Sequence, residues 1–151
     1  MSPGRASADG VVTWQNHHTG RYLEVYKQSA VNGQHVGTWT GNGGTNQKWY
    51  DVRLSDGYWV EQTMLDRSKV LDRWGNGPCH LTIWDYWGGA QQRWREHKVA
   101  AGWWGLINKA GCEGDIYWDA ASTYLDTSIY NVGLAGQRCV ESTGDRNCHW
   151  K

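Results

Sequence analysis

The chain has 151 residues, a length that suits one domain with its own hydrophobic core. Lys and Arg together number 15, as do Asp and Glu, so no net charge attracts a polyanion. This balance argues against binding to nucleic acids or anionic membranes, and no apolar run approaches the ~20 residues that span a bilayer.

The aromatic residues are 12 Trp and 8 Tyr, and the chain has no Phe. Every aromatic side chain therefore carries a polar group, which suits half-buried rings and hydrogen-bonding surfaces. With 20 Gly and only 2 Pro, the chain has many positions for tight turns. Together these features predict an all-β protein with many loops.

The first ten residues lack the apolar segment of an intact signal peptide, although Ala6-Ser7-Ala8 resembles the small-residue end of one. We expect residues 1–10 to form a disordered tail and the protein to be secreted. After this tail, short apolar or alternating segments between Gly- and Asn-rich turns predict a series of strands.

These strands recur as one set of four elements. The first set covers residues 11–14, 21–25, 35–39 and 47–52. The second set covers residues 58–61, 69–72, 81–84 and 91–94. The third set covers residues 103–108, 123–126, 137–140 and 147–150, and an insertion at residues 110–121 interrupts it.

A Gln-x-Trp motif marks the repetition: Gln47-Lys48-Trp49 returns as Gln92-Arg93-Trp94 and, altered, as Cys148-His149-Trp150. The repeats cover about residues 11–55, 56–100 and 101–151. Four short strands cannot bury their apolar face alone, so the three units must associate.

The fold that fits is a β-trefoil, an all-β fold with pseudo-threefold symmetry, formed here by a single domain over residues 11–151. We expect Trp49, Trp94 and Trp150 to share its core. Gln47 and Gln92 would satisfy backbone groups at strand ends.

The four cysteines have three possible pairings, and no Cys-x-x-Cys spacing suggests zinc. Disulfides in an exported protein are the preferred interpretation, with four buried thiols as the alternative. Cys139 and Cys148 close a short loop and are the favoured pair, which leaves Cys79 with Cys112 by elimination.

Two segments carry a resemblance to a known family. They are Thr19-Gly20-Arg21-Tyr22-Leu23-Glu24 and Asn42-Gly43-Gly44-Thr45-Asn46-Gln47-Lys48-Trp49. The chain resembles the ricin B-type lectins, especially the compact actinomycete members, from Val11 to Lys151. The resemblance implies a carbohydrate-binding β-trefoil.

In that family each active repeat offers an acid on the second strand, an aromatic platform on the third, and an amide before the final Trp. A sugar packs its C–H face on the ring, and its hydroxyls bond to the carboxylate and the amide. Such sites are weak singly and gain by avidity.

The resemblance assigns candidate sugar-binding residues to each repeat. Repeat two, ranked first, offers Asp72, Trp84, Gln91 and Gln92. Repeat one offers Glu24, Trp39, Asn46 and Gln47, with His35 nearby. Repeat three, ranked last, offers Asp126 and Asn147, with Val140 at the platform position and Tyr130 as its substitute.

Each of these residues also has a plainer interpretation. A given Trp more often packs than binds ligand, and Asp72 or Asp126 can hold a turn. His17-His18 lacks a further ligand at metal-binding spacing. The surplus tryptophans either form a binding surface or seal the barrel; they are Trp74, Trp87, Trp103, Trp104 and Trp118.

No catalytic signature is present. Asp115 and Asp119 in the insertion are a carboxylate pair of the kind used in glycoside hydrolysis, which is the less favoured interpretation. The favoured prediction is a non-enzymatic carbohydrate-binding protein that needs no cofactor or metal. The alternatives are a trefoil with decayed sugar sites that binds a secreted protein partner, and an enzyme or toxin that uses the insertion.

Overall fold

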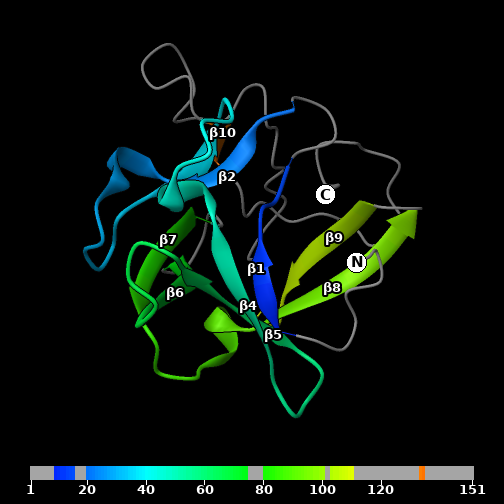
Figure 1. Cartoon of the computed structure of the whole chain (residues 1–151). Coiled ribbons are helices and arrows are strands. Elements are labelled where there is room, and N and C mark those ends of the chain that lie inside the picture. Colours follow the sequence, from blue (N-terminus) through cyan, green and yellow to red (C-terminus); the bar gives the residue numbers. More distant parts are fainter. Residues whose placement is uncertain (1–8, 16–19, 75–79, 101–102, 111–132, 135–151) are drawn as a thin grey trace.

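The computed structural model describes residues 9–15, 20–74, 80–100, 103–110 and 133–134. This part of the chain consists of short strands, turns and one-turn 3-10 helices (Figure 1). The strands of repeat one are β1 (Gly10–Val12), β2 (Tyr22–Val25), β3 (Val36–Trp39) and β4 (Trp49–Arg53). Those of repeat two are β5 (Trp59–Thr63), β6 (Lys69–Trp74), β7 (His80–Asp85) and β8 (Trp94–Ala100). Repeat three contributes β9 (Trp103–Asn108) and β10 (Gly133–Leu134).

The first and fourth strands of the repeats form one antiparallel sheet. In it β1 pairs with β4, β4 with β5, β5 with β8, and β8 with β9. The second and third strands form hairpins, β2 with β3 and β6 with β7. The β6–β7 hairpin joins the same sheet through β5, whereas β2 and β3 form a separate sheet with β10. In Figure 1 the β2–β3 hairpin lies above β4, while β6 and β7 lie to the left of β4 and β8 and β9 lie to the right. Repeats one and two therefore have the same order of elements.

A cluster of buried apolar residues from both repeats forms the core. Its members are Trp14, Leu23, Val25, Val36, Trp49, Leu71, Leu81, Ile83 and Trp94. The indole of Trp49 donates to the backbone oxygen of Leu23 at 3.1 Å, and that of Trp94 donates to Leu71 at 3.2 Å. The predicted core positions of Trp49 and Trp94 are thus confirmed, whereas Trp150 lies outside the described residues.

The predicted start of the fourth strand is wrong in repeats one and two. Asn46 and Gln47 lie in the 3-10 helix η2 (Thr45–Gln47), and Gln91 and Gln92 lie in η3 (Ala90–Gln92). The backbone N–H of each motif glutamine donates to a glycine oxygen three residues earlier, both at 3.0 Å. The turn continues through the glutamine, so the strand begins only at the motif tryptophan.

Repeat one also contacts repeat two through the turn before β3. Asn32 donates to the Asp85 carboxylate at 3.0 Å and accepts the Asp85 N–H at 2.9 Å. Lys69 completes the group with a 2.7 Å ion pair to Asp85. This network fixes the end of β7, where Trp84 stands.

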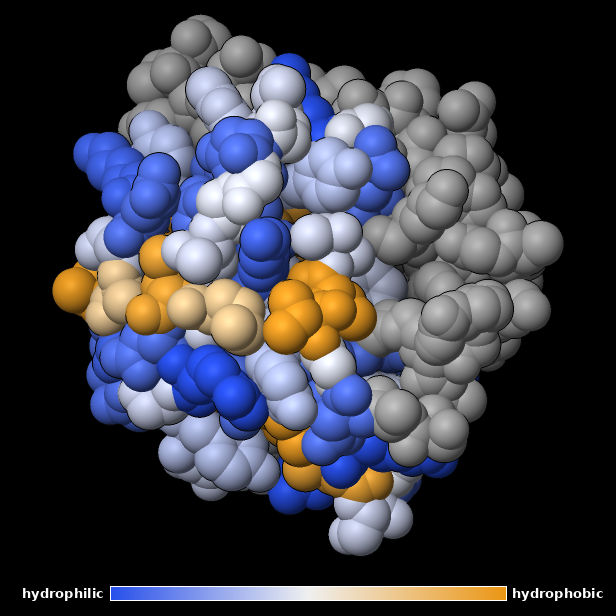
Figure 2. All heavy atoms as spheres, in the orientation of Figure 1, coloured by the Kyte–Doolittle hydropathy of each residue, from blue (hydrophilic) through white to orange (hydrophobic). Residues whose placement is uncertain are grey.

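The described surface is mostly hydrophilic on the face that Figure 2 shows, with apolar side chains gathered in a short band. Among the described residues, no helix has the length and apolar character needed to cross a membrane. All four cysteines lie outside the described part, as do the insertion expected at residues 110–121, apart from its first residue, and the strand expected at residues 137–140.

Candidate functional site

The predicted residues of repeat one meet around the Glu24 carboxylate. Asn46 Nδ2 and Gln47 Nε2 both donate to Glu24 Oε1, at 3.2 and 3.0 Å. Asn46 Nδ2 also donates to the backbone oxygen of Val25 at 3.2 Å. The donors that a sugar would need from Asn46 are therefore already used within the protein.

Burial closes this group further. Glu24 is 5% exposed and Asn46 is 2% exposed. Burial raises the pKa of Glu24 above 4.5, and the hydrogen bonds from Gln47 and Asn46 oppose the rise. The longer side chain of glutamate, compared with the aspartate usual at this position, reaches both amides. Repeat one thus holds a buried polar group whose amide donors are satisfied internally, while Asn46 Oδ1 has no hydrogen-bond partner among the described residues.

Repeat two builds a similar arrangement around Asp72, which is 6% exposed and thus as buried as Glu24. Gln92 Nε2 donates to Asp72 Oδ2 at 2.8 Å and to the backbone oxygen of Asp85 at 3.0 Å. Gln91, at the position of Asn46, is half-buried, and no hydrogen bond joins it to Asp72 in the described part of the chain. Gln91 therefore keeps a side chain that a ligand can reach.

The two motif glutamines perform the backbone role that the sequence predicts for them. Gln47 Oε1 accepts the N–H of Asn42 at 2.9 Å, and its amide donates to the Thr40 oxygen at 2.9 Å. Gln92 Oε1 accepts the N–H groups of Trp87 and Gly88 at 2.9 and 3.2 Å. Each glutamine joins the acid to the turn after the third strand.

The two predicted platforms differ in exposure. Trp39 ends β3 opposite Tyr22 and is half-buried, whereas Trp84 lies near the end of β7 opposite Val70 and is exposed. Gly33 supports one edge of Trp84, because a methyl group added at Gly33 would lie 3.6 Å from the ring. Repeat two has the more accessible ring.

Trp87 belongs to this site, although the sequence pattern placed it only among the surplus tryptophans and not among the sugar-binding residues. Its side chain hydrogen-bonds to the Asp72 carboxylate. Burial raises the pKa of Asp72 above 3.8, while the bonds from Gln92 and Trp87 oppose the rise. Trp87 lies directly before Gly88-Gly89, one turn from the Gln-x-Trp motif. That position in the sequence could have indicated that Trp87 belongs to the site.

An ionic group holds the turn that carries these residues. Arg93 Nε donates to the Gly88 oxygen at 3.1 Å, and Arg93 Nη1 pairs with Asp56 at 2.7 Å. Lys109 pairs with the same Asp56 oxygen at 3.0 Å. The hydrogen bond from Lys109, with those from Tyr58 N–H and Arg93, lowers the pKa of Asp56 to about 2.

Replacing Asp56 with asparagine is expected to make stability less dependent on pH in acid. The folded pKa lies below the ordinary 3.8, so the ionised carboxylate stabilises the fold above pH 3.8. That stabilisation is lost as the pH falls from 3.8 toward 2. The gap in stability between wild type and Asp56→Asn, measured by urea unfolding, should therefore shrink across this window. Ser55→Ala on the same turn is the control, and a gap that stays constant would contradict the assignment.

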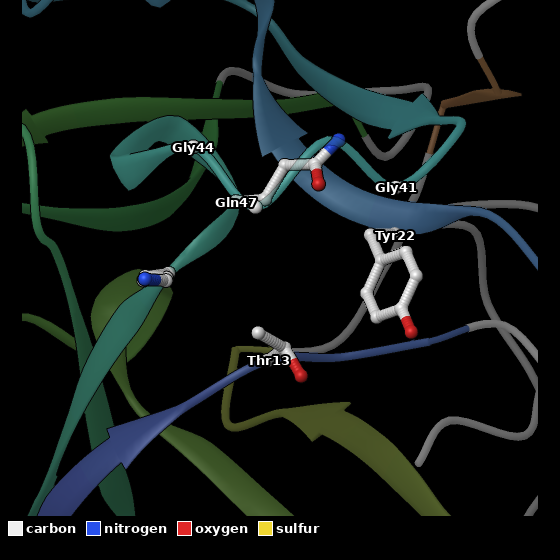
Figure 3. A pocket seen from close by; sticks show the side chains of 7 residues that line it. Thr13, Tyr22, Gly41, Gly44 and Gln47 are labelled. Carbon is white, nitrogen blue, oxygen red and sulfur yellow. The ribbon is translucent and has the colours of Figure 1, made fainter.

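A pocket of about 490 Å³ lies against the Gly41–Gly44 turn in repeat one. Figure 3 shows Thr13, Tyr22 and Gln47 around it. It shares only Gln47 with the predicted sugar-binding residues. The pocket is thus distinct from the group around Glu24, and it has no carboxylate among its lining residues.

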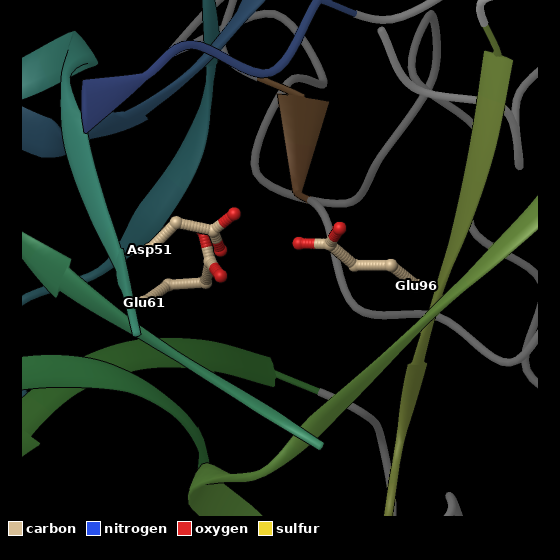
Figure 4. A group of neighbouring side chains, drawn as sticks. All are labelled: Asp51, Glu61 and Glu96. Atoms are coloured by element: carbon tan, nitrogen blue, oxygen red, sulfur yellow. The ribbon is translucent and has the colours of Figure 1, made fainter. Parts of the chain in front are cut away.

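Three carboxylates that the sequence analysis did not single out face one another inside the sheet. Asp51, Glu61 and Glu96, from β4, β5 and β8, bring oxygen atoms within 4.8 Å of one another (Figure 4). Oxygen ligands of this kind suit hard cations. Trp14 Nε1 donates a 2.8 Å hydrogen bond to Glu61 Oε1, and Trp14 is a member of the hydrophobic core. Glu61 therefore connects the carboxylate group to the core.

The predicted residues of repeat three, Asp126, Tyr130 and Asn147, lie outside the described residues. The structure therefore brings together the acid and amide members of two of the three predicted sets. Within them, Glu24, Asn46 and Gln47 form one hydrogen-bonded group, and Asp72 and Gln92 form the other.

Comparison with known proteins identifies the fold. The model of a family described as "Ricin-type beta-trefoil lectin domain-like" matches residues 4–80, half of the chain. A comparison with curated proteins finds no match.

Solved structures give the same result across the chain. The designed threefold-symmetric protein ThreeFoil is 22% identical, with a TM-score of 0.75 and coverage of 93% of this chain and 96% of its own. The C-half of an earthworm R-type lectin in complex with GalNAc is 14% identical, with a TM-score of 0.61 and coverage of 93% and 95%. An exo-beta-1,3-galactanase of Clostridium thermocellum is 22% identical, with a TM-score of 0.72, coverage of 92% of this chain and 29% of its own. The fold is a β-trefoil.

Proposed function

Because the chain belongs to the ricin-type beta-trefoil lectin-like family, we propose that it is a non-enzymatic carbohydrate-binding protein. Its principal sugar site is repeat two, formed by Asp72, Trp84 and Gln91, with Gln92 as the residue that positions Asp72. The observation that carries this choice is the contrast in ring and amide: Trp84 is exposed and Gln91 half-buried in repeat two, whereas Trp39 is half-buried and Asn46 is buried in repeat one. The two acids, Asp72 and Glu24, are equally buried.

The chemistry of repeat two fits a sugar. Asp72 accepts one hydrogen bond from Gln92 and one from Trp87, and a carboxylate has about four acceptor positions. Acceptor capacity therefore remains for a hydroxyl. Trp84 offers an apolar face for C–H groups, and the amide of Gln91 both donates and accepts.

Single substitutions in repeat two are expected to weaken sugar binding. Asp72→Asn removes a charged acceptor and should lower affinity by about tenfold to a hundredfold. Trp84→Ala should lower it by about tenfold, the change that 1.4 kcal/mol gives. Calorimetric titration with galactose, N-acetylgalactosamine, mannose and xylose would measure both effects. N-acetylgalactosamine is included because the earthworm lectin is seen in complex with it.

The matched control is Trp39→Ala, which makes the same change at the half-buried platform of repeat one. It should leave most of the affinity in place, because the amide donors of that repeat are already used by Glu24 and Val25. Intact protein that binds none of the sugars, or equal losses in Trp39→Ala and Trp84→Ala, would overturn the proposal as stated.

A protein partner is the second candidate function, and the closed state of repeat one favours it. A family member with internally satisfied sugar groups can use the same fold to contact a protein. A pull-down with the intact chain, washed with free sugar, separates the two functions. A stoichiometric protein that survives the wash supports the second candidate, and elution by sugar supports the first.

Binding rather than hydrolysis is proposed for this chain, although two similar structures are glycosidases, the galactanase and an endo-beta-galactosidase of Clostridium perfringens. The likeness covers only 29% and 31% of these enzymes' chains, so most of each enzyme has no counterpart here. The even number of cysteines supports the further proposal that the protein acts outside the cell.

A further inference from the structure

Three exposed aromatic side chains stand close together in the chain, and one of them, Trp87, hydrogen-bonds to the Asp72 carboxylate. Trp84, Tyr86 and Trp87 are 36%, 47% and 60% exposed. One ring is sufficient to pack against one sugar unit. The site therefore presents more aromatic surface than a single unit can cover.

The geometry of the turn holds two of these rings in place. Trp87 lies directly over Gly89, where an added methyl group would overlap the ring, and its indole bonds to Asp72. The Tyr86 hydroxyl would lie 3.5 Å from a methyl group at Gly88. The indole N–H of Trp87 thus meets the carboxylate while much of the ring stays open to solvent.

Repeat one provides an internal comparison. When Gly43-Gly44 is aligned with Gly88-Gly89, the positions of Tyr86 and Trp87 are taken by Gly41 and Asn42. In this segment of repeat one Trp39 is the only aromatic residue, and the half-buried ring of Tyr22, from the second strand, packs against Gly41. The additional aromatic surface is therefore specific to repeat two and is not required by the fold.

We propose that repeat two binds a glycan chain of at least two sugar units, one at Asp72 and Trp84 and the next against Tyr86 and Trp87. This inference rests on the proposed function. Each unit of a glycan chain has an apolar C–H face edged by hydroxyls. Indole and phenol rings match that surface, because each combines an apolar face with a polar group at its edge.

The test compares affinity for one sugar unit with affinity for chains of two to four units. The probes are xylose, galactose and N-acetylglucosamine with their β-linked oligosaccharides, titrated against the intact protein. Wild type should bind the two-unit form of its preferred series at least about tenfold more tightly than the single unit. Tyr86→Ala and Trp87→Ala should reduce that ratio to near one.

Two further variants sharpen the result. Gly89→Ala keeps the Trp87 ring but displaces it, and the backbone φ of −73° at Gly89 accepts alanine without strain. Its ratio should therefore fall as in Trp87→Ala. Val11→Ala removes an equally exposed apolar side chain from β1 and should leave the ratio unchanged.

The possible outcomes distinguish this inference from the proposed function. Single sugars and chains bound equally well by wild type would overturn this inference and leave the proposed function in place. A ratio unchanged in Tyr86→Ala and Trp87→Ala would also overturn it. No binding of any probe would overturn both the inference and the proposed function.

Discussion

Replacing Gln92 with leucine is expected to lower the free energy of unfolding by about 3 kcal/mol. Gln92 is fully buried and makes four hydrogen bonds, two through each end of its amide. Leucine fills a similar volume but leaves the acceptors of Asp72 and Asp85 and the donors of Trp87 and Gly88 without this partner. Each buried polar group left unpaired costs about 1–3 kcal/mol, and access of water to the exposed turn recovers part of the total.

Gln91→Leu is the matched control, since it makes the same change one residue earlier at a half-buried position. Its cost should stay within about 0.5 kcal/mol, as is usual for surface substitutions. Urea unfolding of both variants measures the difference. If Gln92→Leu were as stable as Gln91→Leu, the amide of Gln92 would not be what joins Asp72 to the turn.

The sequence predicted the core and the glutamine bonds because both depend on a repeated local pattern. Trp49 and Trp94 occupy equivalent positions and donate to equivalent backbone oxygens, Leu23 and Leu71. The motif recurs because each repeat must satisfy the same geometry. Such positions can be recognised from spacing alone.

The state of each site could not be predicted in the same way. Glu24 differs from the usual aspartate by one methylene, yet that length lets its carboxylate accept from both Asn46 and Gln47. Whether an amide is free for a ligand depends on distances of a few tenths of an ångström. Residue type does not encode those distances.

Trp87 shows a second limit of sequence analysis. The pattern of the family reserves the platform for the third strand, so a ring in the following turn appeared only as a surplus aromatic. Its contact with Asp72 arises because Gly89 leaves room for the ring. In the sequence, the glycine pair Gly88-Gly89 was the only indication of this contact. A glycine pair alone does not show which side chain packs against it.

Trp49→Ala is expected to be as destabilising as any single change in the described chain, at about 3–5 kcal/mol. Trp49 is fully buried in the cluster shared by the two repeats, so its removal leaves a cavity that rigid strands cannot close. Trp49→Phe should cost less, because the ring is mostly retained and the main loss is the 3.1 Å bond to the Leu23 oxygen.

A substitution at the exposed Trp84 tests the binding role of a tryptophan separately from the core role of Trp49. Trp84→Ala deletes the same side chain from the surface and should cost under about 1 kcal/mol of stability. Thermal and urea unfolding of the three variants should show that Trp49→Ala is the most destabilised, Trp49→Phe is intermediate, and Trp84→Ala is the least destabilised. In sugar titration, Trp84→Ala should lose affinity although the protein stays folded. Equal destabilisation by Trp49→Ala and Trp84→Ala would mean that the platform of repeat two is part of the core, and its proposed contact with sugar would then lose its basis.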